Sequence, residues 1–407
     1  MTTTAPTRES GLRRLEEFLP FAGRDYTERR NHVPGIVSGL APYIRHRLIT
    51  EAEVVAKVLQ RYSAQEAEKF IQEVCWRTYW KGWLEMRPFV WFRYQEELQS
   101  LNDRMVREPD FEERVRLAEY GETGLHCLDD WACELRETGY LHNHVRMWFA
   151  SIWVHTLRLP WQLGADFFMR HLLDGDPASN TLSWRWVCGL QTKGKIYQAS
   201  AENIERYTNG RYAPQGLFAG DTEPITEDFL IPQPLQLTRP DPHALGEKTL
   251  LLVTQEDLSP ESWGIPQGDI AGIVLIDTAE SYCGITSLPL AWKRKALQGT
   301  TERLEKGFQC PVLLLNPGGE VEAVRFQTLL SSLLQELRVS TLTIMDPPAG
   351  TTRSLLDLVL LGLKGEGITV RKLRRSWDDT FWPHASHGFF KLKERIPALL
   401  KQLSLSS

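Results

Sequence analysis

The sequence predicts an α-helical domain followed by an α/β domain with a parallel sheet. Up to about residue 210, apolar residues recur at the three- and four-residue spacing of helices. After about residue 248, short β-rich runs alternate with helical stretches, which favours a parallel sheet with helices on both faces. The stretch between them is rich in Pro and Gly. We therefore predict domains at 1–211 and 247–407, joined by a linker at 212–246.

Helix boundaries in the first half follow from capping residues. Thr50 with Glu53 three residues later forms a capping-box pattern, which predicts a helix from Thr50 to Tyr62. Asp176 before Pro177 predicts the start of another helix. Further helices are predicted over residues 64–85, 128–137 (ended by a left-handed Gly139) and 142–157.

The second half contains five β-rich runs. They are residues 249–254, 272–276, 311–315, 340–345 and 367–371. Helical stretches at 320–337 and 351–363 separate several of them. This alternation predicts a five-stranded parallel sheet.

Composition bounds the class of protein. Hydrophobic residues make up 42% and charged residues 24%, as in a globular chain, and no apolar run is long enough to span a bilayer. Residues 1–8 lack the apolar core of a secretory signal, and none of the six cysteines forms a C-x-x-C pair. We expect a cytoplasmic protein with reduced thiols and no metal site. The net charge of −5 gives no pointer to nucleic acid, whereas 14 tryptophans are unusual.

A polar stripe on one predicted helix is the first functional signal. Asp176, Asn180 and Trp184 are spaced i, i+4 and i+8, so they share a face. Asp174 can pair with Arg146 of an earlier helix. The remaining polar groups need partners if they are buried, either in a polar network or on a heterocyclic ligand with donors and acceptors.

Several separated motifs resemble the FAD-binding helical domain of the DNA photolyase and cryptochrome family. The resemblance runs from about residue 12 to residue 212. The motifs are Ser38-Gly39-Leu40-Ala41-Pro42-Tyr43, Glu73-Val74-Cys75-Trp76-Arg77, Gly121-Glu122-Thr123-Gly124, Asn143–Met147 and Asp174–Trp186.

The resemblance implies an FAD site. Its contacts would be Ser38, Leu40, Arg77, Asn143, Arg146, Asp174, Asp176 and Asn180, with Asn180 facing the flavin N5 atom. Ser38 and the neighbouring backbone would hold the diphosphate. Val37 and Ala41 stand where the family carries hydroxyls, so Arg45, Arg47 or backbone N–H groups would have to compensate.

The resemblance also implies a substrate pocket and an electron path. Trp76 and Trp186 would be the walls of a pocket for a cyclobutane pyrimidine dimer, with Glu73 and Asn143 bonding the bases and Met147 as apolar contact. Trp184 and Trp161 match the inner two members of the family's tryptophan relay. The outer member would fall near Val106, so Trp91, Trp153 or a tyrosine would replace it.

The order of the two predicted domains differs from the usual family order, in which an α/β antenna domain comes first. The second domain is either that antenna domain, moved behind the flavin domain, or an unrelated Rossmann-like module. Whether a second, antenna chromophore binds stays open.

Three functions are consistent with the sequence. The first is a photolyase, a carbon–carbon lyase in which light drives an electron from reduced FAD to pyrimidine dimers in single-stranded or duplex DNA. The alternative is a cryptochrome-like blue-light sensor that binds FAD and a protein partner without repairing DNA. The third is a flavoprotein that has lost both roles. A DNA-binding face would draw on Arg24, Arg29, Arg30, Arg45, Arg47, Arg77, Lys193, Lys195 and Arg211.

Overall fold

The computed structural model describes residues 5–214, 222–238, 240, 246–315 and 323–405. The first half is helical, and no strand occurs in its described residues. Its helices are α1 (Arg8–Phe18), α2 (Arg24–Arg29), α3 (Ala41–Arg45), α4 (Glu51–Leu59), α5 (Glu68–Glu85), α6 (Pro88–Arg107), α7 (Pro109–Tyr120), α8 (His126–Thr138), α9 (Asn143–Ser151), α10 (Trp161–His171), α11 (Pro177–Val187) and α12 (Ala201–Tyr207).

The predicted caps are confirmed. Thr50 and Glu53 form a complete capping box at the start of α4. Asp176 caps α11 by accepting a hydrogen bond from the Ser179 N–H. Gly139 ends α8 at a φ of 67°. The helix predicted over 142–157 is wrong in one respect, because α9 passes into a π-helical turn over Ile152–Thr156.

The second half contains the predicted five-stranded parallel sheet, and its strand order is β3-β2-β1-β4-β5. Its strands are β1 (Thr249–Val253), β2 (Ile270–Ile276), β3 (Val312–Leu315), β4 (Thr341–Met345) and β5 (Thr369–Leu373). The accompanying helices are α13 (Ser287–Gly307), α14 (Ala323–Glu336), α15 (Thr351–Gly365), α16 (Ser376–Phe381), α17 (Phe389–Lys393) and α18 (Ile396–Gln402). The predicted helix start at residues 320–322 lies outside the described residues.

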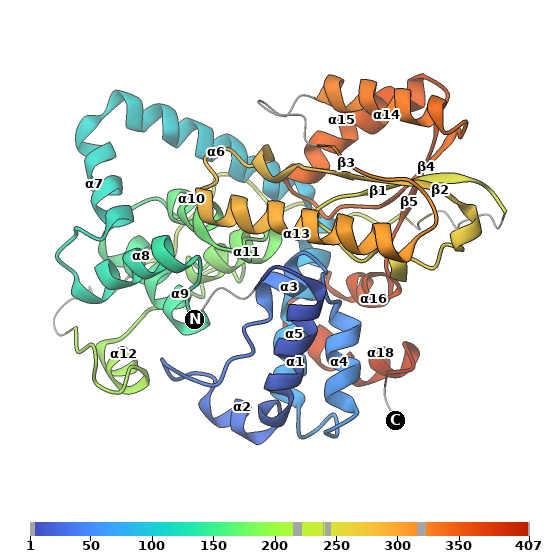
Figure 1. Cartoon of the computed structure of the whole chain (residues 1–407). Helices are drawn as coiled ribbons and strands as arrows, with labels where there is room; N and C mark the ends of the chain where they lie inside the picture. Colours follow the sequence, from blue (N-terminus) through green and yellow to red (C-terminus); the bar gives the residue numbers. More distant parts are fainter. Residues whose placement is uncertain (1–4, 215–221, 239, 241–245, 316–322, 406–407) are drawn as a thin grey trace.

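The two faces of the sheet belong to different cores. Leu250 and Leu252 of β1 pack with α14 and α15, which lie above the sheet in Figure 1. Leu251 and Val253 point the other way and join a core that continues through the helical half. The main hydrophobic core therefore contains residues of both predicted domains. The sheet and the helical half are thus packed against each other.

The last helices return to the first half. The indole N–H of Trp377 in α16 donates to Thr78 Oγ1 in α5 at 2.9 Å. Gly82 of α5 lets Trp382 approach, because a Cβ on Gly82 would lie 2.8 Å from the indole. Residues 376–402 were predicted as part of the α/β domain, and they pack mainly on α5, the helix that carries Glu73, Trp76 and Arg77.

Candidate functional site

Three helices bring the predicted site residues together. α11 contacts both α5 and α9, and it also packs on α10. Glu73, Trp76 and Arg77 come from α5, whereas Asn143, Arg146 and Met147 come from α9. Asn180, Trp184 and Trp186 come from α11, and Asp174 and Asp176 lie just before it. Motifs that are distant in the sequence thus meet around the start of α11.

The predicted pair of Arg146 and Asp174 is confirmed. The guanidinium donates to both carboxylate oxygens of Asp174, at 3.0 and 2.8 Å. Burial alone would raise the pKa of Asp174, but Arg146 outweighs it and the pKa lies below its usual range. The pair places a fixed positive and a fixed negative charge side by side beneath the N-terminal end of α11.

The Asp176 carboxylate lies close to several cationic side chains but accepts few hydrogen bonds. Its Oδ1 accepts the Ser179 N–H at 2.8 Å. Its Oδ2 lies 3.4 Å from Arg45 Nε, 3.5 Å from Lys81 Nζ and 3.9 Å from Arg77 Nη1. Burial by itself raises the pKa of Asp176, but Lys81 and Arg45 lower it far below the usual value. Asp176 is therefore a carboxylate at every ordinary pH.

Several hydrogen-bond donors near Asp174 and Asp176 have no hydrogen-bond acceptor in the described part of the chain. Among the described residues, Arg77 Nη1, Lys81 Nζ and Ser179 Oγ are buried and make no hydrogen bond. Buried donors without a partner are costly, so each one indicates a group that the protein is built to receive or a trapped water. Lys81 and Ser179 were not among the predicted site residues, although Lys81 lies one helical turn after Arg77, on the same face.

The loop at residues 37–42 is held by a residue that the sequence analysis missed. Arg14 of α1 donates from Nε to the Ser38 carbonyl at 2.8 Å. Gly39 has a φ of 65°, and a Cβ there would lie 2.8 Å from the Arg14 guanidinium, so glycine is needed for two reasons. Ser38 Oγ accepts the Leu40 N–H at 3.3 Å, whereas the Leu40 side chain is fully buried in the core. Leu40 therefore presents no side chain to a ligand.

Arg45 is not available to compensate for the hydroxyls missing at Val37 and Ala41, contrary to expectation. Its guanidinium donates to both oxygens of Glu256, at 2.5 and 2.9 Å, and to the Gly175 carbonyl at 2.8 Å. Only 3% of its side chain is exposed, so it is also excluded from a DNA-binding face.

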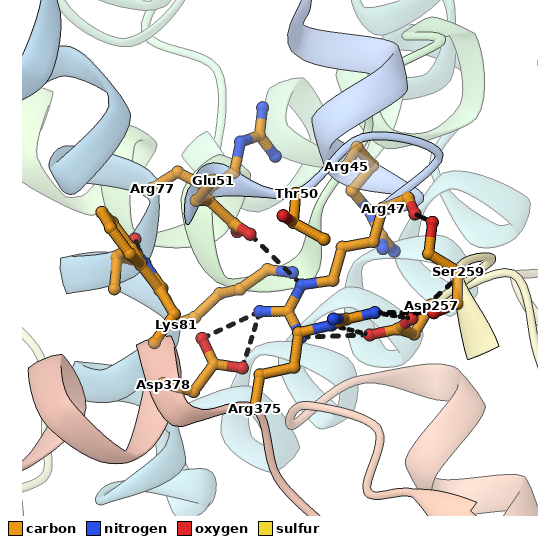
Figure 2. A network of polar contacts seen from close by, with 12 residues as sticks. Arg45, Arg47, Thr50, Glu51, Arg77, Lys81, Asp257, Ser259, Arg375 and Asp378 are labelled. Carbon is orange, nitrogen blue, oxygen red and sulfur yellow. Dashed lines mark hydrogen bonds and ion pairs between the residues drawn. The ribbon is translucent and has the colours of Figure 1, made fainter. Parts of the chain in front are cut away.

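Arg47 is likewise committed elsewhere (Figure 2). It donates to both oxygens of Asp378, at 2.8 and 2.6 Å, and lies 3.4 Å from Asp257 and 3.3 Å from Glu51. Arg375 donates to the same Asp257 carboxylate, at 2.6 Å to each oxygen. We call these residues, with Arg45 and Glu256, the junction network. It joins the helical half to the sheet and to α16.

Asn180 has a fixed orientation. Its amide nitrogen donates to the Ala165 carbonyl in α10 at 2.8 Å. An amide anchored through its NH₂ group presents its carbonyl oxygen as an acceptor. This bond leaves the carbonyl oxygen and the second amide hydrogen of Asn180 for other partners.

The five predicted substrate residues lie on the outer side of the same helices. Trp76 stacks on Phe389 of α17, with 3.7 Å between ring centroids and 15° between planes, and Trp186 stacks on Tyr197 at 5.4 Å. Each indole thus has one face supported by another ring. Asn143 is exposed, with its amide nitrogen 4.0 Å from Met147 Sδ.

Glu73 is the acid of this group. Its carboxylate lies 3.8 Å from Arg30 Nε, and 40% of its side chain is exposed. The protein around it nevertheless desolvates the carboxyl, and this outweighs Arg30 and raises the pKa of Glu73. Its protonated form thus persists to higher pH than in an ordinary glutamate.

Trp184 and Trp161 are both buried and both lie against α10. Trp161 is the first residue of that helix, and a Cβ on Gly164 would lie only 2.3 Å from the Trp184 ring. Gly164 makes this close approach possible.

Comparisons with known proteins identify this helical half. A model described as the FAD binding domain of DNA photolyase matches residues 70–215. Over residues 70–215 the chain therefore matches the FAD-binding domain of DNA photolyases.

Curated relatives match this chain over only part of their length. The deoxyribodipyrimidine photo-lyase of Streptomyces griseus is 29% identical over 186 residues, which is 45% of this chain and 39% of that protein. The enzyme of the same name from Synechococcus is 29% identical over 244 residues, or 54% of this chain and 49% of that protein. The chain thus spans between about two fifths and one half of the length of these relatives.

Solved structures give a similar partial match. A cryptochrome from Synechocystis has 24% identity and a TM-score of 0.40, covering 49% of this chain and 43% of its own. A class III photolyase from Agrobacterium tumefaciens has 24% identity and a TM-score of 0.37, covering 50% and 43%.

The residues around α11 fit the cofactor of this family. FAD carries two phosphates and a ring with donors and acceptors, and the helical half offers buried donors without a hydrogen bond at Arg77, Lys81 and Ser179 beside two carboxylates. Arg14 adds a cation at the Ser38 loop. Cavities of about 340 and 210 Å³ lie elsewhere, one against α8 and α13 and the other beside Trp161.

Two absences complete the description of the site. Within the described ranges, no group of three His, Cys, Asp or Glu side chains could hold a metal ion. No helix in the described part of the chain is long and apolar enough to cross a membrane.

Proposed function

We propose that this protein is a flavin-dependent photolyase that splits cyclobutane pyrimidine dimers in DNA. One observation carries the proposal: α11 packs on α5 and α9, and these helices carry, besides the predicted cofactor residues, the acid Glu73 and two indoles, Trp76 and Trp186, that each stack on another ring. When bound in its reduced form, FAD supplies on illumination the electron that opens the cyclobutane ring. The chain's own residues bind, orient and protonate.

Cofactor binding is assigned to two groups of residues. Arg14, Ser38 and the backbone at Leu40 would hold the diphosphate, with Arg14 replacing the donors missing at Val37 and Ala41. Arg146, Asp174 and Asn180 would flank the flavin ring, and Asn180 would accept a hydrogen bond at N5. Asp176 would keep Arg77 and Lys81 charged and in place. Asn143 would lie at the border between cofactor and substrate.

Substrate binding is assigned to the outer side of α5, α9 and α11. A flipped dimer would pack between Trp76 and Trp186, while Asn143 and Met147 would contact the bases. Glu73 would donate a hydrogen bond to a base carbonyl, and the negative charge that develops there would strengthen this bond. Its raised pKa favours the protonated form that can donate.

DNA binding would use the exposed cations that remain after Arg45, Arg47 and Arg77 are excluded, the last because it is largely buried beside Asp174 and Asp176. These are Arg24, Arg29, Lys193, Lys195 and Arg211, with Arg30 partly buried beside Glu73. Affinity should fall as salt rises, because each phosphate contact releases a counterion. The curated relatives described above carry photolyase names, which supports repair over sensing. A cytoplasmic location is part of the same proposal.

A light-dependent repair assay tests the function. Protein reconstituted with FAD and reduced should restore dimer-containing oligonucleotides under blue light and leave them unchanged in the dark. Glu73→Gln should lower repair about a hundredfold while FAD stays bound. The matched control is Glu66→Gln, an exposed acid just before α5, which should repair at the normal rate. Bound FAD with no repair of single-stranded or duplex substrate would contradict the proposal in favour of a sensor.

A further inference from the structure

The predicted electron path through Trp184 and Trp161 continues to a tyrosine and not to a third tryptophan. Trp161 stacks on Tyr94 of α6, with ring centroids 5.5 Å apart and planes at 25°. Because electron tunnelling falls steeply with distance, a stacked ring is the favoured next carrier. Tyr94 is almost fully buried, so the path does not reach solvent at this residue.

Tyr94 begins a hydrogen-bonded chain. Its hydroxyl oxygen lies 3.4 Å from that of Tyr282, in the sheet half of the protein. Tyr282 donates its own hydroxyl hydrogen to Asp166 Oδ1 at 2.7 Å. Tyr94 must therefore be the donor to Tyr282, since each phenol carries one hydrogen. The direction Tyr94 to Tyr282 to Asp166 is fixed by chemistry.

Asp166 is held in place as an acceptor. Arg170 donates to its Oδ2 at 2.6 Å and is shared with Glu119. Both phenols are buried, and desolvation raises the pKa of each, so neither ionises before it is oxidised. Loss of a proton must then accompany loss of an electron.

A second route for the electron leads from Trp184 to Trp153. Among the described residues, this route has no further ring that is easily oxidised. Trp153 meets Trp184 edge-on at 6.4 Å between centroids. Its next ring neighbours are Phe149 and Phe167, which are far harder to oxidise than indole or phenol. Its N–H is bonded to the Pro160 carbonyl, which cannot take up a proton.

The surroundings of Trp161 also disfavour a resting positive charge. The Arg185 guanidinium lies 5.8 Å from the Trp161 ring centroid. An indole radical cation beside a guanidinium is repelled, whereas a neutral phenoxyl radical is not. Arg185 is paired with Glu227, which weakens this effect without removing it.

We propose that the Tyr94–Tyr282 pair replaces the outer tryptophan of the relay, with Asp166 as proton acceptor. One electron moves from Tyr94 to the Trp161 radical cation and restores the indole. One proton moves from Tyr94 to the oxygen of Tyr282, while the proton of Tyr282 moves to Asp166. The products are a neutral Tyr94 phenoxyl radical and a neutral Asp166 carboxylic acid.

This proposal rests on the proposed function only for its oxidant, which in the working protein is light-excited flavin. The transfer among side chains can be tested without the cofactor. A cavity of about 210 Å³ borders Trp161, together with Glu97, Pro160 and Gln162, and gives a small neutral oxidant a place to approach.

The experiment is pulse radiolysis of flavin-free protein with azide radicals, which oxidise tryptophan. Indolyl and phenoxyl radicals have distinct absorption bands, so their interconversion can be followed directly. The wild-type protein should show a phase of phenoxyl growth whose rate does not depend on protein concentration. Tyr94→Phe should abolish that phase, and Tyr282→Phe and Asp166→Asn should each slow it about a hundredfold.

The matched control is Trp91→Phe, because Trp91 also contacts Tyr94, with 5.4 Å between ring centroids. It should leave the phase intact. Loss of the phase in Trp91→Phe with its retention in Tyr282→Phe would overturn the proposal. If Tyr282 and Asp166 only anchor the sheet to α6 and α10, their variants should lower the unfolding temperature while the phase persists, and that result would also overturn it. A protein that binds no FAD would contradict the proposed function but leave this test valid.

Discussion

Two buried charged regions of this protein, the junction network and the groups around the start of α11, differ in how their donors are used. In the junction network, Arg45 and Arg47 each donate to both oxygens of one carboxylate, and Arg375 does the same for Asp257. Only Arg47 Nε and Glu51 of this network, among the described groups named above, share an ion pair without a hydrogen bond. Around the start of α11, Arg77, Lys81 and Ser179 keep donors without a hydrogen bond. The first region holds two halves of the chain together, and the second is the proposed ligand site.

The difference shows what a buried charge indicates. Removing one partner from a closed pair leaves the other charge unpaired in a medium of low polarity, so such pairs are sensitive to mutation even where their net stabilisation is small. A cluster with spare donors is already unsatisfied and gains stability when its ligand binds. The two regions should therefore respond to different experiments.

The largest expected effect is in the junction network. Arg47→Ala leaves Asp378, Asp257 and Glu51 buried with one cation fewer and should lower the free energy of unfolding by about 3–5 kcal/mol. Urea unfolding followed by circular dichroism measures it. The matched control is Arg24→Ala, because Arg24 forms an exposed pair with Glu28 and should change stability by less than about 0.5 kcal/mol. Equal effects of the two variants would contradict the distinction.

Acid should weaken the junction network as the pH falls below 4.5. Burial alone raises the pKa of Glu256, but Arg45 outweighs it and lowers the pKa to about 2 from 4.5. A lowered carboxyl pKa stabilises the fold above pH 4.5, and that stabilisation, about 3 kcal/mol, is lost as the pH falls from 4.5 towards 2. Unfolding free energy measured between pH 6 and 2 should therefore fall less steeply in Glu256→Gln than in the wild type. A parallel slope in both proteins would exclude Glu256 from this role.

Asp174→Asn should separate binding from folding. It removes the charge from a bidentate pair beside the proposed flavin ring, which costs about 2 kcal/mol of interaction with Arg146. FAD retained after desalting should drop sharply while the circular dichroism spectrum is kept. Asp378→Asn in the junction is the comparison variant, and it should reduce stability while the folded fraction keeps its FAD affinity. A reversal of these two patterns would show that the ligand site has been assigned to the wrong region.

The smallest effect is expected at Arg14. Arg14→Lys keeps the charge but loses the planar donor group that bonds the Ser38 carbonyl, so FAD affinity should fall about tenfold, equivalent to about 1.4 kcal/mol. Fluorescence titration of the flavin-free protein with FAD measures it. Arg13→Lys, one residue earlier and on the exposed side of α1, is the control and should bind normally. Unchanged affinity in Arg14→Lys would remove Arg14 from the proposed phosphate site.

Much of the fold followed from local sequence. The capping box at Thr50, the Asp176-Pro177 start of α11 and the glycine stop at residue 139 depend on residues within one or two turns, and all three are confirmed. The five strands were also predicted, because each is a short β-rich run between turn signals. The pair of Arg146 with Asp174 could be anticipated because both residues belong to recognisable motifs.

Only the tertiary structure decided which residues that are far apart in the chain become partners. The sequence offered Arg45 and Arg47 as phosphate or DNA ligands, and folding commits them to Glu256 and Asp378, more than 200 residues away. It equally brings Phe389 onto Trp76 and Tyr282 between Tyr94 and Asp166. Caps and strands follow from short-range hydrogen bonding and periodicity, whereas the use of a buried charge or ring depends on which distant surface excludes water from it. That choice is made when the helical half and the sheet pack into one core.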